Sequence, residues 1–225
     1  DRAGGRRVRV VVIGLGAFGL WFSRTMLEMG HEVVAIEQDA EKVDRFVDWA
    51  SKTIEGDATD PEVLRRAGAE EADAAVISTA NNLSTTILAT VALRDLQVEE
   101  IYAKVGSSTE QRALEHFGLA GTVFPEREAG FRLAHSIVST SVLDYTPLGP
   151  ELSLQEIAVP PSWHGETLTQ LALRSELGVV VVAVRDALTE KIALPPDPSV
   201  PFKDSDSVIL AGSDERLEEL AHESE

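Results

Sequence analysis

The chain has 225 residues, of which 44% are hydrophobic and 26% charged, proportions typical of an ordinary soluble protein. Its 38 acidic residues outnumber its 20 lysines and arginines, and the formal charge of −18 disfavours free nucleic acid and a bare anionic membrane surface as partners. The absence of cysteine excludes disulfides and cysteine-ligated metals and favours a cytoplasmic protein, and no apolar run reaches the roughly 18 residues of a membrane-spanning helix.

The first predicted elements are a strand over residues 8–13 and a helix that starts at Ala17, joined by a glycine-rich loop. Gly14, Gly16 and Gly19 follow the strand in the pattern Gly-x-Gly-x-x-Gly. Such a loop lets a phosphate group sit on a helix N-terminus. The pattern alone is a weak signal, but here it has a strand before it and a helix after it.

The same alternation of strand and helix continues through the first 126 residues. Further strands are predicted over 31–37, 52–60 (a short strand with its loop), 73–79, 101–105 and 121–126, with helices from Asp60-Pro61-Glu62, over 83–96 and over 108–117. Six strands alternating with helices predict a Rossmann-like, doubly wound parallel sheet, which binds ligands beyond the carboxyl ends of its strands.

The residue that ends the second strand supports a nucleotide site. Glu37 lies 23 residues after Gly14, where an acidic side chain can hydrogen-bond ribose hydroxyls. A carboxylate there disfavours a 2′-phosphate, so NADP is not expected. Nucleotide binding is therefore preferred over a purely structural turn.

Polar residues also end the other strands: Gly56-Asp57-Ala58-Thr59, Ser78-Thr79-Ala80-Asn81, Lys104 and Pro125-Glu126. Each has a simpler interpretation beside the functional one. Asp57 could make a local turn hydrogen bond, Lys104 could merely be exposed, and Glu126 could belong to a solvated first helical turn.

A second unit follows. Residues 127–143 read as a long helix, and 144–150, with two prolines and a glycine, as a linker. From residue 151 we predict strands over 152–160, 179–185, 191–195 and 206–212, a short helix over 164–173, and a final acidic helix capped by Ser213 or Asp214. The expected division is residues 1–126, then 127–150 as crossover helix and linker, then 151–225 as a small α+β domain that dimerisation would help to stabilise.

Taken together, these segments resemble the cytoplasmic regulatory subunits of the Ktr and Trk potassium-uptake systems, which join an RCK (regulator of potassium conductance) N-terminal domain to an RCK C-terminal domain. The matching segments are VVIGLGAFG, GHEVVAIEQDAEKV, GDATD, DAAVIST, IYAKV, VFPEREAGFRLA and KDSDSVILAGSDERLEEL. They span essentially the whole chain, and it is their combination that is specific.

The resemblance implies that the first domain binds an adenine nucleotide: ATP or ADP, with AMP and NAD(H) as alternatives. It implies that Gly14, Gly16 and Gly19 approach the phosphates, that Glu37 holds the ribose, and that Asp57 and Ala58 face the adenine. Lys104 and Glu126 match positions near the terminal phosphates. Glu126 also matches a ligand of a divalent cation, Mg²⁺ or Ca²⁺, between paired subunits. The remaining expected contacts are Ala17, Phe18, Gln38 and Thr79.

The resemblance also implies an assembly. The helix after the sixth strand would pack on a neighbouring subunit, and dimers would build an octameric ring on the inner face of the membrane, under a potassium transporter of the KtrB or TrkH type. Some members bind cyclic di-AMP in the second domain, where Arg174 is the candidate contact. No catalytic residue is expected.

One position departs from the family pattern. Many members have arginine where this chain has Ala17, and that arginine reaches the nucleotide phosphates. A lost charge-assisted contact to phosphate is worth roughly 1.5–3 kcal/mol. The change predicts weaker discrimination of the γ-phosphate and a preference for ADP, AMP or NAD(H), unless Arg127 or Arg132 of a neighbouring subunit substitutes.

Two other functions compete with regulation as interpretations of the sequence. An NAD-dependent dehydrogenase needs an acid or base near the nicotinamide, and in residues 151–225 the candidate, His164, has no obvious partner in the sequence. A redox-sensing repressor is disfavoured by the charge of −18. The five histidines are scattered without the spacing of a metal site.

Overall fold

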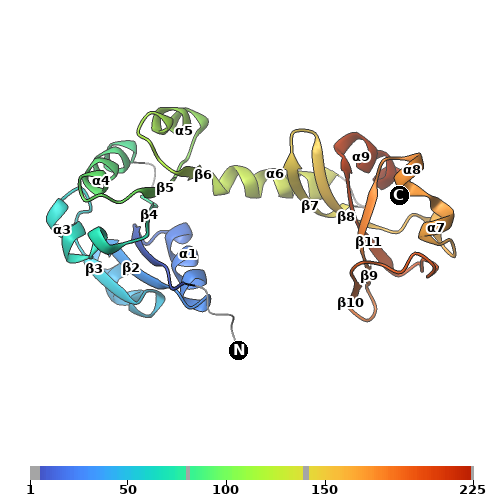
Figure 1. Ribbon diagram of the computed structural model, residues 1–225, viewed down its shortest axis with the longest axis horizontal. Coiled ribbons are helices and arrows are strands. Elements are labelled where there is room, and N and C mark those ends of the chain that lie inside the picture. Colours follow the sequence, from blue (N-terminus) through green and yellow to red (C-terminus); the bar gives the residue numbers. More distant parts are fainter. Residues whose placement is uncertain (1–5, 80–81, 139–141, 224–225) are drawn as a thin grey trace. The chain divides into compact units, whose positions relative to one another are not determined.

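The computed structural model describes residues 6–79, 82–138 and 142–223. The chain divides into two compact units, residues 1–126 and 127–225 (Figure 1). The first contains a six-stranded parallel sheet, and the second a five-stranded antiparallel sheet with short helices. The predicted fold, a Rossmann-like sheet followed by a smaller α+β unit, is confirmed.

The first unit alternates strands and helices as expected. Its strands are β1 (Arg9–Ile13), β2 (Glu32–Glu37), β3 (Lys52–Glu55), β4 (Ala74–Ile77), β5 (Glu100–Lys104) and β6 (Gly121–Val123). Its helices are α1 (Ala17–Glu28), α2 (Ala40–Arg45), α3 (Pro61–Arg66), α4 (Leu83–Asp95) and α5 (Ser108–Glu115), with 3-10 turns η1 (Val47–Trp49) and η2 (Ala69–Glu71). Pro125 and Glu126, expected at the end of a strand, instead open helix α6 (Pro125–Val138).

The strand order β3-β2-β1-β4-β5-β6 places β1 in the middle of the sheet, with all pairs parallel. Val11 and Ile13 of β1 face a core completed by α3 and α4, and Val10 and Val12 face one completed by α1. The chain turns from β1 towards β2 on one side and meets β4 on the other. Sheets with this reversal bind ligands at the carboxyl ends of the central strands.

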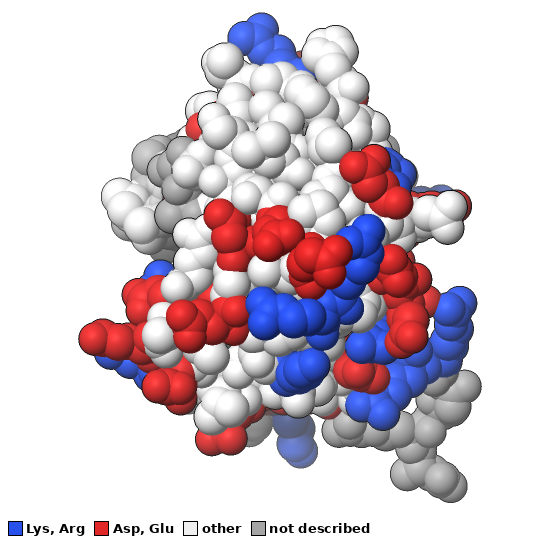
Figure 2. Space-filling view, turned by 90° about the vertical axis from the view of Figure 1, so that its left-hand side faces the viewer, with Lys and Arg blue, Asp and Glu red and all other residues white. Residues whose placement is uncertain are grey.

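Charged side chains are interspersed rather than separated on one face of the first unit. Figure 2 shows acidic and basic groups intermingled there, next to an uncharged region. Although the chain carries a formal charge of −18, this face therefore has no continuous patch of basic side chains among its described residues.

The second unit is built on the strand order β10-β9-β11-β8-β7. Its remaining elements are β7 (Val142–Gly149), β8 (Leu152–Ala158), η3 (Pro161–Trp163), α7 (Leu168–Leu171), α8 (Leu173–Glu176), β9 (Val180–Asp186), β10 (Lys191–Ala193), β11 (Asp206–Ser213) and α9 (Asp214–Glu223). Side chains from α7, α8 and α9 pack with β8 and β11 around one core. No helix among the described residues combines the length and apolar character needed to cross a bilayer.

Residues 144–150, expected to form a linker, are instead mostly strand. Residues 142–149 form β7, which pairs antiparallel with β8 through a turn in which Glu151 has a left-handed φ of 58°. Val142 and Tyr145 are buried in the core of the unit, which the sequence pattern did not reveal. Pro147 lies in β7, an edge strand, which is the place in a sheet where proline is accommodated.

The helix expected over residues 164–173 is shorter and broken. Gly165 has a φ of +82°, outside helical geometry, and Thr167 caps α7 by accepting a hydrogen bond from the Gln170 backbone N–H. Ala172 then adopts a left-handed φ of 47°, which ends α7 and starts α8. The capping box at Thr167 thus sets the start of the helix more strongly than the apolar pattern does.

Candidate functional site

A cavity of about 240 Å³ lies at the carboxyl edge of the parallel sheet. Residues from the ends of β1, β2 and β4 line it, together with residues after β3 and at the starts of α2 and α4. The described lining residues are Ile13, Gly14, Gly16, Ile36, Glu37, Gln38, Lys42, Gly56, Ala58, Ser78, Thr79, Asn82 and Thr85.

The three glycines of the loop have different roles. Gly14 has a φ of +93°, and a Cβ there would lie 2.6 Å from the Ser78 carbonyl oxygen. A Cβ on Gly19 would lie 2.1 Å from the Gly14 carbonyl oxygen. A Cβ on Gly16 would meet no atom within 4 Å, so this position borders open space at the cavity. Gly14 and Gly19 therefore allow close packing, whereas Gly16 leaves room for a ligand.

Helix α1 begins directly after the glycine loop, so its N-terminal end lies at the cavity. Gly16 is its N-cap residue, no side chain caps it, and its first turn has no acidic residue. Ala17 is exposed, and the Phe18 ring packs with Phe22 at a centroid distance of 6.3 Å within the core, away from the cavity lining. Uncapped N–H groups and the helix dipole make such an end favourable for an anion.

The Glu37 carboxylate is held by backbone donors. Its Oε2 accepts a hydrogen bond from the Leu15 N–H at 2.8 Å, and its Oε1 accepts from the N–H groups of Gln38 at 2.9 Å and Asp39 at 3.2 Å. The Lys42 ammonium lies 3.8 Å from Oε2. Glu37 therefore ties the end of β2 to the glycine loop while also lining the cavity.

Three other predicted residues line the cavity, namely Gln38, Ala58 and Thr79. Ala58 is only 3% exposed, and the Thr79 hydroxyl lies 3.1 Å from the Thr86 hydroxyl. Asp57 is not among the lining residues. Its Oδ1 accepts hydrogen bonds from the Thr59 N–H at 2.9 Å and hydroxyl at 2.8 Å, and these bonds hold the pKa of the Asp57 carboxyl below its ordinary value. The contacts of Asp57 are therefore those of a local turn, the simpler of the two interpretations given above.

Lys104 and Glu126 form a separate pair outside the cavity lining. The Lys104 ammonium lies 2.6 Å from Glu126 Oε1, and its side chain is only 17% exposed. This hydrogen bond, followed by one from the Glu126 backbone N–H, lowers the pKa of the Glu126 carboxyl. Among the described residues no group of three acidic, histidine or cysteine side chains could hold a metal ion.

The cavity includes residues that the sequence analysis did not single out as ligand contacts: Lys42, Gly56, Ser78, Asn82 and Thr85. Gly56 directly follows β3 and Ser78 directly follows β4. The expectation that ligands bind at the carboxyl ends of the strands, which identified Glu37, could therefore have identified these two residues as well. Asn82 caps α4 by accepting from the Thr85 N–H at 3.1 Å, a typical N-cap signal. Lys42 carried no sequence signal, because only the course of α2 brings it to the cavity.

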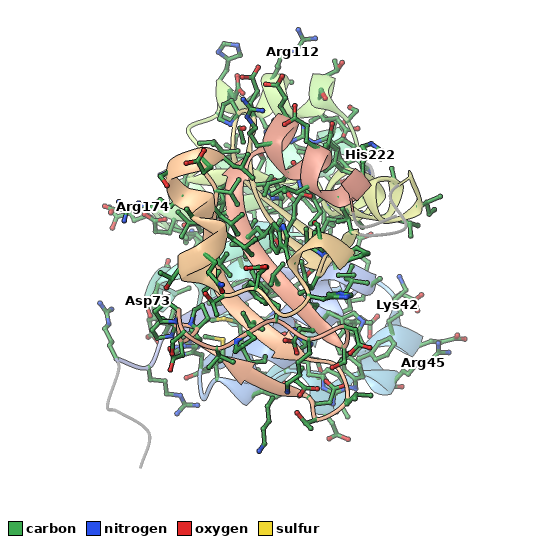
Figure 3. The ribbon with its side chains drawn as sticks, turned by 90° about the vertical axis from the view of Figure 1, so that its right-hand side faces the viewer. Lys42, Arg45, Asp73, Arg112, Arg174 and His222 are labelled. Carbon is green, nitrogen blue, oxygen red and sulfur yellow. The ribbon has the colours of Figure 1, made fainter. Side chains whose placement is uncertain are left out.

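A second, open cavity of about 510 Å³ lies in the second unit. It is lined by residues of α7, α8 and β9, and Arg174 of α8 is its basic side chain among the described lining residues (Figure 3). The other described lining residues are Leu168, Ala172, Leu173, Ser175, Val179, Val180 and Val181.

Two family descriptions match the chain: the TrkA-N domain over residues 10–125 and the TrkA-C domain over residues 154–223. The Ktr system potassium uptake protein C of Bacillus subtilis (strain 168) is 34% identical over 202 residues, 90% of each chain. The chain belongs to the Ktr and Trk family of potassium-uptake proteins. The Ktr system potassium uptake protein A of Vibrio alginolyticus is another relative, 28% identical over 92% of this chain and 93% of its own length.

Solved structures share the fold of this Ktr/Trk family member. The GsuK RCK domain superposes with a TM-score of 0.68 at 18% identity, over 97% of this chain but only 48% of the GsuK chain, so the present chain spans about half of that protein. The Kef C-terminal domain of Shewanella denitrificans in its AMP-bound form gives a TM-score of 0.51 at 19% identity, over 58% and 80% of the two chains. With this family membership, the chain is a regulatory subunit of a potassium-uptake system, and an oxidoreductase is not favoured.

Proposed function

We propose that the cavity at the carboxyl edge of the parallel sheet binds an adenine nucleotide, and that the bound nucleotide regulates potassium transport without being consumed. One observation supports this most directly: the uncapped start of α1 at Gly16 and the Glu37 carboxylate line the same cavity. The first suits a phosphate and the second a ribose hydroxyl. The AMP-bound Kef domain, with the same fold, supports the assignment.

Each predicted contact has a place in this proposal. The N–H groups around Gly16, Ala17 and Phe18 would face the phosphates, with Gly14 and Gly19 shaping the loop. Glu37 and Gln38 would contact the ribose, Ala58 would pack on the base, and Thr79 would lie on the opposite wall. Asp57 would act through the turn it stabilises rather than by touching the base.

Lys104 and Glu126 would act at the far end of a longer nucleotide or at the contact with a second copy of the chain. Since Lys104 already occupies one oxygen of the single Glu126 carboxylate, a Mg²⁺ or Ca²⁺ ion there would need further oxygen ligands, which a second copy could provide. With alanine at position 17, we expect ADP, AMP or NAD(H) to bind at least as well as ATP.

Regulation requires that the nucleotide bind two arrangements of the assembly with different affinity. We propose that this chain forms dimers that build an octameric ring, and that the ring contacts a membrane-embedded potassium transporter from the cytoplasmic side. In the second unit, the cavity beside Arg174 is our candidate for cyclic di-AMP, because an apolar wall and one cation suit a base and a phosphate.

Calorimetric titration with ATP, ADP, AMP, NAD and NADH, each with and without Mg²⁺ or Ca²⁺, tests the nucleotide site, and cyclic di-AMP tests the second cavity. We expect micromolar binding of an adenine nucleotide, with the ligand recovered unchanged. Turnover of a nicotinamide cofactor, or no nucleotide binding, would contradict the proposal. Glu126→Gln should abolish any dependence of nucleotide affinity on the cation, whereas Arg174→Gln should affect only cyclic di-AMP.

A further inference from the structure

The Glu37 carboxylate has little hydrogen-bonding capacity left for a ligand. A carboxylate accepts about four hydrogen bonds, two at each oxygen. Both sites of Oε1 are taken by the N–H groups of Gln38 and Asp39, and one site of Oε2 is taken by the N–H of Leu15. The remaining site on Oε2 can accept from one ribose hydroxyl. Glu37 therefore fixes the ribose weakly and offers nothing to a phosphate.

Lys42 lies near the Glu37 Oε2 atom without a hydrogen bond to it. Its ammonium is 3.8 Å from Oε2, beyond hydrogen-bond length, and the side chain is 43% exposed. No hydrogen bond joins this ammonium to another residue within the described ranges 6–79, 82–138 and 142–223. Lys42 is thus held near the cavity by charge while its three donors stay available to a ligand. Figure 3 shows it on α2, next to Arg45.

The start of α1 carries no cationic side chain for a phosphate. The first turn of α1 contains Ala17, Phe18 and Gly19 and so provides only backbone N–H groups and the helix dipole. Among the described residues that line the cavity, Lys42 is the only basic side chain and Glu37 the only acidic one. The Glu37 Oε2 atom beside the Lys42 ammonium also accepts from the Leu15 N–H, so the ammonium and the start of the glycine loop are next to the same carboxylate oxygen.

We propose that Lys42 is the cationic contact for the 5′-phosphate of the bound nucleotide, and that it selects phosphorylated nucleosides over nucleosides. This inference rests on the proposed nucleotide function and names the side chain that determines specificity. In this proposal Glu37 accepts from a ribose hydroxyl and also attracts the Lys42 ammonium, which in turn contacts the 5′-phosphate. An ammonium that donates to a phosphate oxygen makes a charge-assisted hydrogen bond.

The test compares wild type with Lys42→Met and Lys42→Arg by calorimetry, using ADP, AMP, adenosine and adenosine 2′,5′-bisphosphate. We expect Lys42→Met to weaken ADP and AMP about tenfold while leaving adenosine unchanged, and Lys42→Arg to restore most of the affinity. Lys52→Met is the matched control, because Lys52 is an exposed lysine at the start of β3, away from the cavity lining. It should bind all four ligands as wild type does.

The outcomes separate this inference from the function on which it rests. If the ratio of ADP affinity to adenosine affinity is the same in wild type and in Lys42→Met, Lys42 is not the phosphate contact, although the nucleotide function stands. If the loss is confined to adenosine 2′,5′-bisphosphate, Lys42 contacts the ribose side and the 5′ assignment is wrong. If wild type binds neither ADP nor AMP, both proposals fail. Thermal unfolding of each variant verifies that the exposed substitution leaves the fold intact.

Discussion

The Glu37 carboxylate accepts a 2.8 Å hydrogen bond from the Leu15 backbone N–H, and so links the end of β2 to the glycine loop that follows β1. This contact joins residues 22 positions apart in sequence, and it orients the loop before any ligand arrives. A pre-oriented loop saves the entropy of ordering on binding. Glu37 is thus part of the architecture of the cavity as well as a candidate ligand contact.

Glu37→Gln should destabilise the first unit and weaken nucleotide binding together. The amide replaces one acceptor oxygen with a donor, so at least one of the three backbone N–H groups loses its partner. Leaving such a group unpaired costs about 1–3 kcal/mol. Urea denaturation followed in parallel with ADP titration measures both effects. Glu55→Gln, at the exposed end of β3, removes the same charge and should change neither. A Glu37→Gln variant as stable as wild type would contradict this role.

Gly16→Ala and Gly19→Ala should separate binding from folding. The added methyl group at position 19 would overlap the Gly14 carbonyl oxygen, at 2.1 Å, and we expect a loss of about 1–3 kcal/mol or more in unfolding free energy. At position 16 the methyl group enters open space, so the fold should be unaffected. Because that space borders the cavity, ADP affinity should fall roughly tenfold, about 1.4 kcal/mol. Equal stability losses in the two variants would be inconsistent with the different packing of these glycines.

The Lys104–Glu126 pair should be visible in the pH dependence of the carboxyl group. The hydrogen bond from Lys104 lowers the pKa of Glu126 below its ordinary value, so the pair contributes stability above the unfolded pKa and loses it as pH falls through the folded pKa. The contribution is small, because Glu126 is 60% exposed. Carbon-detected NMR titration should show the Glu126 pKa rising in Lys104→Met. An unchanged titration curve in that variant would rule out Lys104 as the cause.

Ala172→Gly should stabilise the second unit. Ala172 has a φ of 47° and a ψ of 32° between α7 and α8, a conformation that glycine adopts without steric cost. The relief of strain exceeds the extra unfolded-state entropy of glycine by about 0.5–1 kcal/mol. Chemical denaturation should show this gain. Ala129→Gly, within helix α6, is the matched substitution and should instead destabilise the protein, by about 1 kcal/mol. If both substitutions changed the unfolding free energy in the same direction, the backbone conformation of Ala172 would not be the cause of the effect.

The sequence by itself determined the alternation of strands and helices in the first unit, the glycine loop and the acidic residue that ends β2, because these depend on local patterns that repeat at short range. The tertiary structure decided what those patterns could not. Pairing with β8 turned the expected linker around Pro147 into an edge strand. Packing also brought Lys104 into a pair with Glu126, whereas the turn of Asp57 with Thr59 is a local contact that the sequence had offered as one interpretation. Lys42 reached the cavity only through the path of α2, because a long, flexible side chain acquires its role from the groups that packing places around it.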